Sequence, residues 1–137
     1  MEPLKIISAK TSTTRPEIYK DGLDETAVAT LEFPGGVLAD IKTSFGENIN
    51  HLNIVCQKGS INMEPYSGYN GLKGKSPLGE INYRYEVPWQ QAKQMDDDAK
   101  SIKQGKPMLV AGDEGLRDIR IVEAIHKSAN TGRVVEL

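Results

Sequence analysis

The stretch TAVATLEFPGGVLADIKTSF, residues 26–45, decides the fold because apolar and polar residues alternate on both sides of a glycine-rich turn. Side chains two apart in a strand share a face, and one face therefore collects Ala27, Ala29, Leu31 and Phe33 from the first arm and Val37, Ala39, Ile41 and Phe45 from the second. Between the arms, Pro34 presets φ for a turn and Gly35 accepts the positive φ that follows. The stretch predicts an antiparallel hairpin.

Alternation extends on both sides of this hairpin, from Pro3 to about Glu86. An earlier strand is expected from Leu4 to about Thr14. Segment 51–57 predicts a strand that buries Leu52, Ile54 and Cys56, and the turn at Lys58-Gly59 leads into another strand over residues 60–63. A further strand is expected over residues 81–87.

After Trp89 the spacing of apolar residues changes from two to three or four, which predicts helices. The first helix has the stripe Trp89, Ala92, Met95, Ala99 and Ile102, and Gly105 with Pro107 ends it. Asp113 is expected to cap a second helix, which Asn130 and Gly132 close. The inner face of that second helix should be Leu116, Ile119, Val122, Ile125 and Ala129. Residues 134–137 can add a short edge strand.

A block of strands followed by helices predicts an α+β fold: an open, mainly antiparallel β-sheet with two helices packed on one face. The other face is polar, and its members are Thr30, Glu32, Asp40, Lys42, Ser44, Asn53 and Gln57. Such a face meets solvent or forms a wet interface with another subunit, so it is available for oligomerisation.

Composition excludes several classes of protein. The chain has 137 residues, enough for one domain with a core, and 17 Lys and Arg against 19 Asp and Glu give a net charge of −2. No run of basic residues interleaves with aromatic ones, so nucleic acid is not an expected partner. No apolar run approaches the roughly 18 residues of a membrane span. One cysteine excludes a disulfide framework. We expect a soluble protein of the cytoplasm and leave a periplasmic parent open.

Familiar catalytic motifs are also missing. The glycine-rich loop Glu64–Gly74 is not a phosphate cradle, because residues 75–79, KSPLG, cannot open the helix that would hold the anion. His51 and His126 have no ligand-spaced partners, so no metal site is expected. No serine occupies a strand-to-helix elbow, and the acidic run 96–98 fits a solvated helix face. Lys73 and Lys75, which have glycine neighbours, are expected to be exposed.

Two polar segments lie at strand ends, where a scaffold presents binding groups: residues 46–51 and residues 66–73. Their asparagines, tyrosines and His51 suit the hydroxyls of a sugar or polyol. The same residue types are common in turns, and both interpretations stay open here.

Several segments resemble one known family. Met95–Pro107 and Gly112–Gly132 resemble the end of the glucose-fructose oxidoreductase, inositol dehydrogenase and MocA (Gfo/Idh/MocA) family. Phe33–Val37, Gln57–Gly59 and Met63–Tyr69 look like the corresponding strands, turn and loop of glucose-fructose oxidoreductase-like members. The resemblance covers essentially all 137 residues.

The resemblance implies a two-domain parent. Members have an N-terminal dinucleotide-binding domain, with a glycine fingerprint and a catalytic lysine in a Glu-Lys-Pro motif, and a C-terminal α+β domain. This sequence has neither motif. Residues 1–137 are therefore interpreted as a single C-terminal substrate and oligomerisation domain without its Rossmann domain, and Met1 as a start placed at a domain boundary. Asp24 and His51 do not replace the family's catalytic Asp and His.

By this resemblance, the full-length protein is an NAD(P)-dependent oxidoreductase that acts on a sugar or polyol hydroxyl. The chain alone is expected to be inactive and to hold no catalytic, cofactor-binding or metal residue; NAD or NADP belongs to the full-length enzyme. Expected partners are its own Rossmann domain, the substrate, and further copies in a dimer or tetramer. Two alternatives are a purely structural dimerisation module and a stand-alone sugar-binding domain. The predicted substrate-binding residues are Arg15, Asn48, Asn50, His51, Tyr66, Tyr69 and Asn70.

Overall fold

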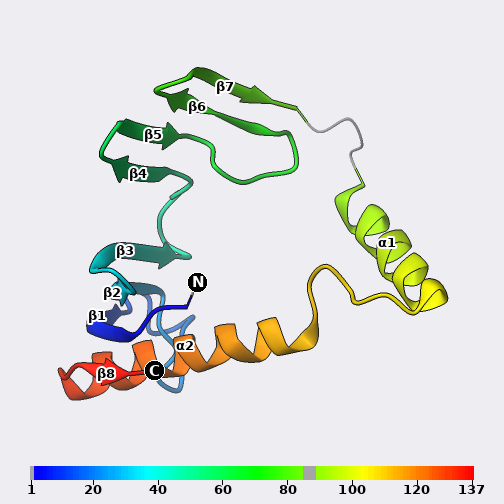
Figure 1. The fold of residues 1–137 in the computed structure, drawn as a ribbon. Coiled ribbons are helices and arrows are strands. Elements are labelled where there is room, and N and C mark those ends of the chain that lie inside the picture. Colours follow the sequence, from blue (N-terminus) through cyan, green and yellow to red (C-terminus); the bar gives the residue numbers. More distant parts are fainter. Residues whose placement is uncertain (1, 85–88) are drawn as a thin grey trace. The chain divides into compact units, whose positions relative to one another are not determined.

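The structure, a computed structural model, describes residues 2–84 and 89–137 (Figure 1). The chain divides into two compact units, one formed by Met1–Ile49 with Val110–Leu137 and the other by Asn50–Leu109. Each unit contains one antiparallel four-stranded sheet and one helix. The predicted α+β class with antiparallel strands is confirmed.

The first unit is a sheet covered by one helix. Its strands are β1 (Lys5–Ser12), β2 (Thr26–Phe33), β3 (Val37–Ser44) and β8 (Val135–Glu136), in the order β3-β2-β1-β8. Helix α2 (Gly112–Thr131) packs on β1 and β8, as Figure 1 shows. The last strand, expected at the C-terminal end of the sequence, pairs with β1 at the sheet edge.

The hairpin of residues 26–45 is confirmed in detail. Leu31 pairs with Ala39 and Phe33 with Val37, so the apolar residues of both arms share a face as expected. The Gly36 amide donates to the Phe33 carbonyl at 3.2 Å and closes the turn. Gly35 has φ of +84°, which a residue with a side chain adopts only under strain, so the position requires glycine.

The core lies between this sheet and α2. It consists of Ile6, Ala29, Leu31, Ala124, Ile125 and Val135. Ile6 has no exposed surface, and burying such a side chain contributes about 1.5–3 kcal/mol. Ser128 is also buried, and its hydroxyl donates to the Arg133 carbonyl at 2.8 Å. The buried polar group is thereby paired, as a stable core requires.

The start of α2 differs from the prediction. Asp113 is not the N-cap: Ala111 occupies that position without a side-chain hydrogen bond, and Asp113 lies in the first turn with Glu114. Negative charge in the first turn interacts favourably with the helix dipole, so the acid still suits its place. The helix ends at Gly132 as predicted, with φ of +65°.

The predicted inner face of α2 is wrong over its first half. Leu116, Ile119 and Val122 are 53%, 57% and 46% exposed. Ile125, a predicted member of the inner face, is buried; the other buried residues of the helix are Ala124 and Ser128, and Ile121 packs beside them. The buried side chains of the helix all lie in its second half, so the sheet covers only that part and the apolar residues of the first half stay exposed.

The second unit contains the remaining strands. They are β4 (Leu52–Cys56), β5 (Gly59–Met63), β6 (Leu72–Ser76) and β7 (Gly79–Tyr83), paired in chain order. The strand predicted over residues 81–87 corresponds to β7, and its part over residues 85–87 lies outside the described residues. Helix α1 (Gln90–Gln104) has no buried residue and ends at Gly105 in the left-handed conformation, as its sequence predicts.

The strands thus lie in two sheets of four, where alternation suggested one open sheet. Alternation identifies strands, and short turns identify hairpins, but neither pattern specifies which strands pair beyond a hairpin. The prediction that Cys56 is buried is wrong. Its strand β4 is the edge of its sheet and is exposed at every residue, so alternation there does not lead to burial.

The outer face of the first sheet carries polar cross-strand pairs. The Thr30 hydroxyl donates to Asp40 at 2.7 Å, and Thr26 and Ser44 share a hydrogen bond of 2.7 Å. Lys5 and Glu32 form an ion pair of 3.1 Å. Because these residues pair with one another, the face is polar without being strongly charged.

Candidate functional site

The loop between β5 and β6 is fastened at its base. The Glu64 amide donates to the Lys73 carbonyl at 2.8 Å, and the Lys73 amide donates to the Pro65 carbonyl at 3.1 Å. Gly71 is buried with φ of +110°, and a Cβ there would collide with the Tyr83 carbonyl. Glycine at this position therefore lets the end of the loop lie close against the end of β7.

A cavity of about 520 Å³ lies beside this loop and the β6–β7 hairpin. Pro65, Gly71 and Leu72 form part of its wall. Its other lining residues offer hydroxyl, amide and cationic groups and are Tyr69, Asn70, Lys73, Asn82, Tyr83 and Arg84. No carboxylate is among the described residues that line it. Small-molecule sites typically measure about 300–1,000 Å³ and hold a few convergent polar groups, and this cavity has both properties.

Asn50 holds the loop from the side of β4. Its Oδ1 accepts hydrogen bonds from the amides of Tyr66 and Ser67, both at 3.1 Å, and its Nδ2 donates to the Ser67 carbonyl at 2.8 Å. The side-chain amide is therefore used in positioning the loop. Of the predicted site residues, the structure brings Asn50 and Tyr66 together in this way.

Tyr69 and Asn70 lie together at the cavity. The Tyr69 hydroxyl accepts a hydrogen bond from Gln91 Nε2 at 2.7 Å, and 62% of the residue is exposed. Tyr66 is 44% exposed. Both tyrosines are thus partly exposed and accessible to a ligand.

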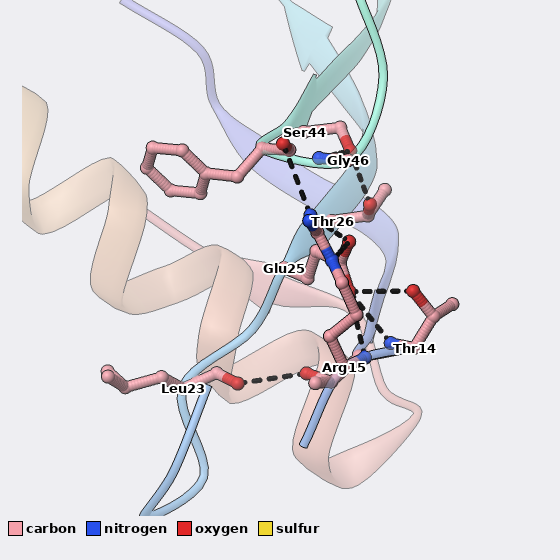
Figure 2. Close-up of polar contacts among 9 residues, drawn as sticks. Thr14, Arg15, Leu23, Glu25, Thr26, Ser44 and Gly46 are labelled. Atoms are coloured by element: carbon pink, nitrogen blue, oxygen red, sulfur yellow. Dashed lines mark hydrogen bonds and ion pairs between the residues drawn. The ribbon is translucent and has the colours of Figure 1, made fainter. Parts of the chain in front are cut away.

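Arg15 lies in the first unit, where its guanidinium forms an ion pair with a buried acid (Figure 2). Glu25 has 4% of its side chain exposed, and its carboxylate accepts from Arg15 Nε at 2.8 Å and Nη2 at 2.6 Å. The amide and hydroxyl of Thr14, both at 2.8 Å, donate to the same carboxylate. The guanidinium also donates to the Phe45 carbonyl at 3.3 Å and lies over the Tyr19 ring.

This arrangement has a clear electrostatic result. Hydrogen bonds from the Arg15 guanidinium, and then from Thr14, lower the pKa of Glu25 from 4.5 to about 2, although desolvation acts in the opposite direction. The same pairing raises the pKa of Arg15. A Cβ on Gly46 would collide with the Glu25 carboxylate. The cluster of Thr14, Arg15, Glu25 and Gly46 therefore joins the loop after β1 to the end of β3.

Asn48 and His51 are exposed, the first in the first unit and the second in the other. Within residues 2–84 and 89–137, neither side chain has a hydrogen bond or ion pair, so both are accessible to a ligand. Of the seven predicted residues, Arg15 and Asn48 belong to one unit, and the other five belong to the second.

Sequence reasoning missed Glu25, Asn82 and Arg84, and treated Lys73 only as exposed. Glu25 precedes a strand and has no local pattern that marks it as buried. Asn82 and Arg84 could have been found from the hairpin around Pro77 and Gly79, because its register places Asn82 opposite Lys73. Among the described residues no group of three His, Cys, Asp or Glu could hold a metal ion, and neither helix has the length and apolar character to cross a membrane.

Solved structures resemble this chain over nearly its whole length. An aldose-aldose oxidoreductase from Caulobacter crescentus, solved with glycerol, matches with a TM-score of 0.85 and 27% identity, over 99% of this chain and 42% of that one. A myo-inositol 2-dehydrogenase from Lactobacillus plantarum matches with a TM-score of 0.71 and 21% identity, over 99% and 42%. The WlbA dehydrogenase from Bordetella pertussis, solved with NADH and UDP-GlcNAcA, matches with a TM-score of 0.66 and 17% identity, over 98% and 40%.

The chain spans less than half the length of each of these proteins. For the two lower identities the likeness concerns the fold alone. Residues 3–137 match the family described as "Oxidoreductase family, C-terminal alpha/beta domain". Because that match extends over nearly the entire sequence, the chain belongs to the C-terminal domain family of the Gfo/Idh/MocA oxidoreductases.

Proposed function

We propose that this chain is the substrate-side domain of an NAD(P)-dependent oxidoreductase that acts on a sugar or polyol hydroxyl. One observation carries the proposal: in a member of this family, hydrogen-bonding side chains line a cavity of about 520 Å³. The aldose-aldose oxidoreductase that resembles the chain was solved with glycerol, a polyol. The dinucleotide and the catalytic lysine are assigned to an N-terminal Rossmann domain outside residues 1–137.

The lining suits hydroxyl recognition. A sugar hydroxyl both donates and accepts, and the side-chain amides of Asn70 and Asn82 can do the same. Tyr69 offers a ring face and a hydroxyl. A pocket of such groups rejects an analogue that lacks a matching hydroxyl, because its polar groups would be left unpaired. Asn50 and Tyr66 are proposed to position the loop, and Asn48 and His51 to supply further contacts.

The residues of this chain do not fit the dinucleotide itself. A pyrophosphate site needs a glycine-rich turn whose amides meet the anion at a helix start. The first turn of α2 carries Asp113 and Glu114, whose charges repel a pyrophosphate. The residue before α1 is Trp89 and not a glycine, so the start of this helix has no glycine-rich turn. We therefore assign no redox step to these residues, and the isolated chain is expected to be inactive.

The test is Tyr69→Phe in the full-length enzyme, with a neutral sugar or polyol as substrate. Loss of one hydroxyl contact should lower kcat/KM about fivefold, because a hydrogen bond of this kind is worth about 1 kcal/mol. Steady-state kinetics measure the loss, and light scattering should show an unchanged oligomer.

Tyr19→Phe is the matched control, because it removes a tyrosine hydroxyl from a residue of the first unit that is not among the residues lining the cavity. It should keep wild-type kinetics. Equal kinetics for Tyr69→Phe and the wild type would remove the main support for a substrate role of this loop.

We also propose that the outer face of the first sheet mediates assembly. The exposed apolar residues Val28 and Leu38 lie on that face among the polar pairs, and mixed faces of this kind are typical of wet protein interfaces. Lys42 is paired with Glu47 at 2.7 Å at the same face.

Lys42→Glu should therefore weaken a dimer, because it places two acids side by side at the interface. Light scattering over a dilution series should show a higher dissociation constant, by about tenfold or more. Lys58→Glu, in the turn between β4 and β5, makes the same charge change in the other unit and should leave the dimer intact. A wild-type chain that is monomeric at every concentration would contradict the assembly role.

A further inference from the structure

Two cations, Lys73 and Arg84, line the cavity beside the β6–β7 hairpin. Lys73 pairs in register with Asn82, so these two side chains share a face of the hairpin, and Arg84 lies directly after the end of β7. All three line the cavity of about 520 Å³. Leu72 and Tyr83, paired one position away in the register, also line this cavity.

Neither cation is neutralised within the part of the chain that the structure describes. Lys73 and Arg84 form no ion pair there, whereas Arg15 pairs with Glu25, and Arg117 pairs with Glu2 and Glu114. Carboxylates are also missing from the described cavity lining. Glu80, the acid of this hairpin, is opposite Lys75 in the register, near the turn.

Such a lining favours an anion over a neutral ligand. The planar guanidinium of Arg84 can donate two parallel hydrogen bonds to a carboxylate or phosphate, and the Lys73 ammonium adds a point charge. Tyr69, Asn70 and Asn82 stay available for neutral hydroxyls. A neutral sugar would satisfy these three groups and leave both cations without an ion-pair partner among residues 2–84 and 89–137.

We propose that Lys73 and Arg84 bind the anionic substituent of a charged sugar, a phosphate ester or a carboxylate, in the cavity beside β6 and β7. The inference rests on the proposed function, because it names the class of sugar. Phosphate and carboxylate share the recognition chemistry, and the experiment separates them.

The experiment is an NMR titration of the 137-residue chain with D-glucose 6-phosphate, D-glucuronate and D-glucose. At least one of the two anionic sugars should bind about tenfold or more tightly than glucose, because hydrogen bonds to charged groups are stronger than neutral ones. Backbone amides of residues 69–73 and 82–84 should shift. Added NaCl should weaken binding of the anionic sugar and leave glucose unaffected. The tighter anion identifies the substituent.

Variants assign the effect to the two cations. Lys73→Ala and Arg84→Ala should each lower the affinity for the anionic sugar about tenfold, and Arg84→Lys should restore part of the loss. Both residues are exposed, so the variants should fold, which circular dichroism checks. Lys75→Ala is the control: it removes the same charge on the same face, two residues beyond the cavity lining, and should bind like the wild type.

Three results would overturn the inference: no binding of either anionic sugar, glucose binding as tightly as both, or an equal loss in Lys75→Ala. None of these results decides the proposed function, which is tested separately by the kinetics of Tyr69→Phe with a neutral substrate. Conversely, anionic sugars could bind as expected while the full-length protein shows no oxidoreductase activity. That result would support the anion site and contradict the proposed reaction.

Discussion

Glu25 shows how much a single residue can contribute through its contacts. Five hydrogen bonds from Thr14 and Arg15 reach its buried carboxylate, and the pKa of Glu25 falls from 4.5 to about 2. The native state therefore binds the proton less tightly than the unfolded state does. The stabilisation is complete above about pH 4.5 and is lost as the pH falls toward 2.

We predict that Glu25→Gln lowers the urea midpoint at pH 7, because the neutral amide leaves Arg15 without its counter-charge. The midpoint of the variant should also depend less on pH between about 4.5 and 2, the window in which the wild type loses this contribution. Urea denaturation at a series of pH values measures both effects.

Glu80→Gln makes the same chemical change at an exposed residue and should keep the wild-type midpoint at pH 7. A Glu25→Gln variant whose midpoint follows the wild type throughout this pH range would show that the cluster contributes nothing to stability.

At the residue scale, the residue types suggest which side chains could bind a ligand, but they do not show which of them already contact other residues in the fold. Arg15 was selected because it lies in a polar loop, yet its guanidinium is paired with an acid ten residues later. Lys73 was considered only as an exposed residue with glycine neighbours, and the strand pairing that places it at the cavity depends on the fold. The substrate-binding role of the seven selected residues stays a prediction.

Among the elements, β1 and α2 pack against each other and together form much of the core of the first unit. Ile6, with no exposed surface, lies in the core that Ala124 and Ile125 complete from the helix. Replacing it leaves a cavity that the close-packed sheet and helix can fill only in part.

Ile6→Ala should therefore lower the free energy of unfolding by about 2–5 kcal/mol, and Ile6→Val by about 0.5–1.5 kcal/mol. Urea denaturation followed by circular dichroism measures both, and the valine variant keeps the test usable if the alanine variant does not fold. Leu4→Ala, at a residue that is 48% exposed, is the control and should cost less than either. Equal costs for Leu4→Ala and Ile6→Ala would contradict the assigned core.

Local patterns predicted the elements well and their packing less well. The hairpin at residues 33–37 and the glycine ends of both helices follow from backbone preferences that the residues themselves impose. The inner face of α2 was wrong because the helix has apolar residues on more than one face, and only the sheet determines which face is buried. The N-cap was predicted at Asp113, two residues after its actual position, because an acid is favourable both at the cap and in the first turn of a helix.

Across the whole molecule, burial is unequal. The six buried apolar residues found in the described part of the chain, Ile6, Ala29, Leu31, Ala124, Ile125 and Val135, all belong to the first unit. The sheet of β4 to β7 has exposed or half-buried side chains along all four strands. Local stability follows the amount of buried apolar contact.

We predict that amide hydrogens of β4 to β7 exchange with solvent about tenfold or more faster than those of β1 and β2, because opening the second unit exposes less apolar surface. Hydrogen exchange measured by NMR on the chain gives the comparison residue by residue. Equal protection in the two sheets would show that the second unit has a stability that its side-chain burial does not explain.

The organisation into two units was the feature least accessible from the sequence. Composition and length are compatible with one sheet or two, and the two units are discontinuous in the chain, with residues 1–49 joined to residues 110–137. That joining comes from the packing of α2 on β1 and from the pairing of β8 with β1, contacts between residues far apart in the sequence. The family resemblance, which uses longer segments, was the more informative signal and is confirmed.

Cys56 has a practical consequence. It is the only cysteine of the chain and lies exposed on the edge strand β4. A maleimide dye would therefore attach at one defined place without any engineered mutation. Fluorescence from that dye would report on the sheet that carries the cavity while the buried core of the other unit stays chemically untouched.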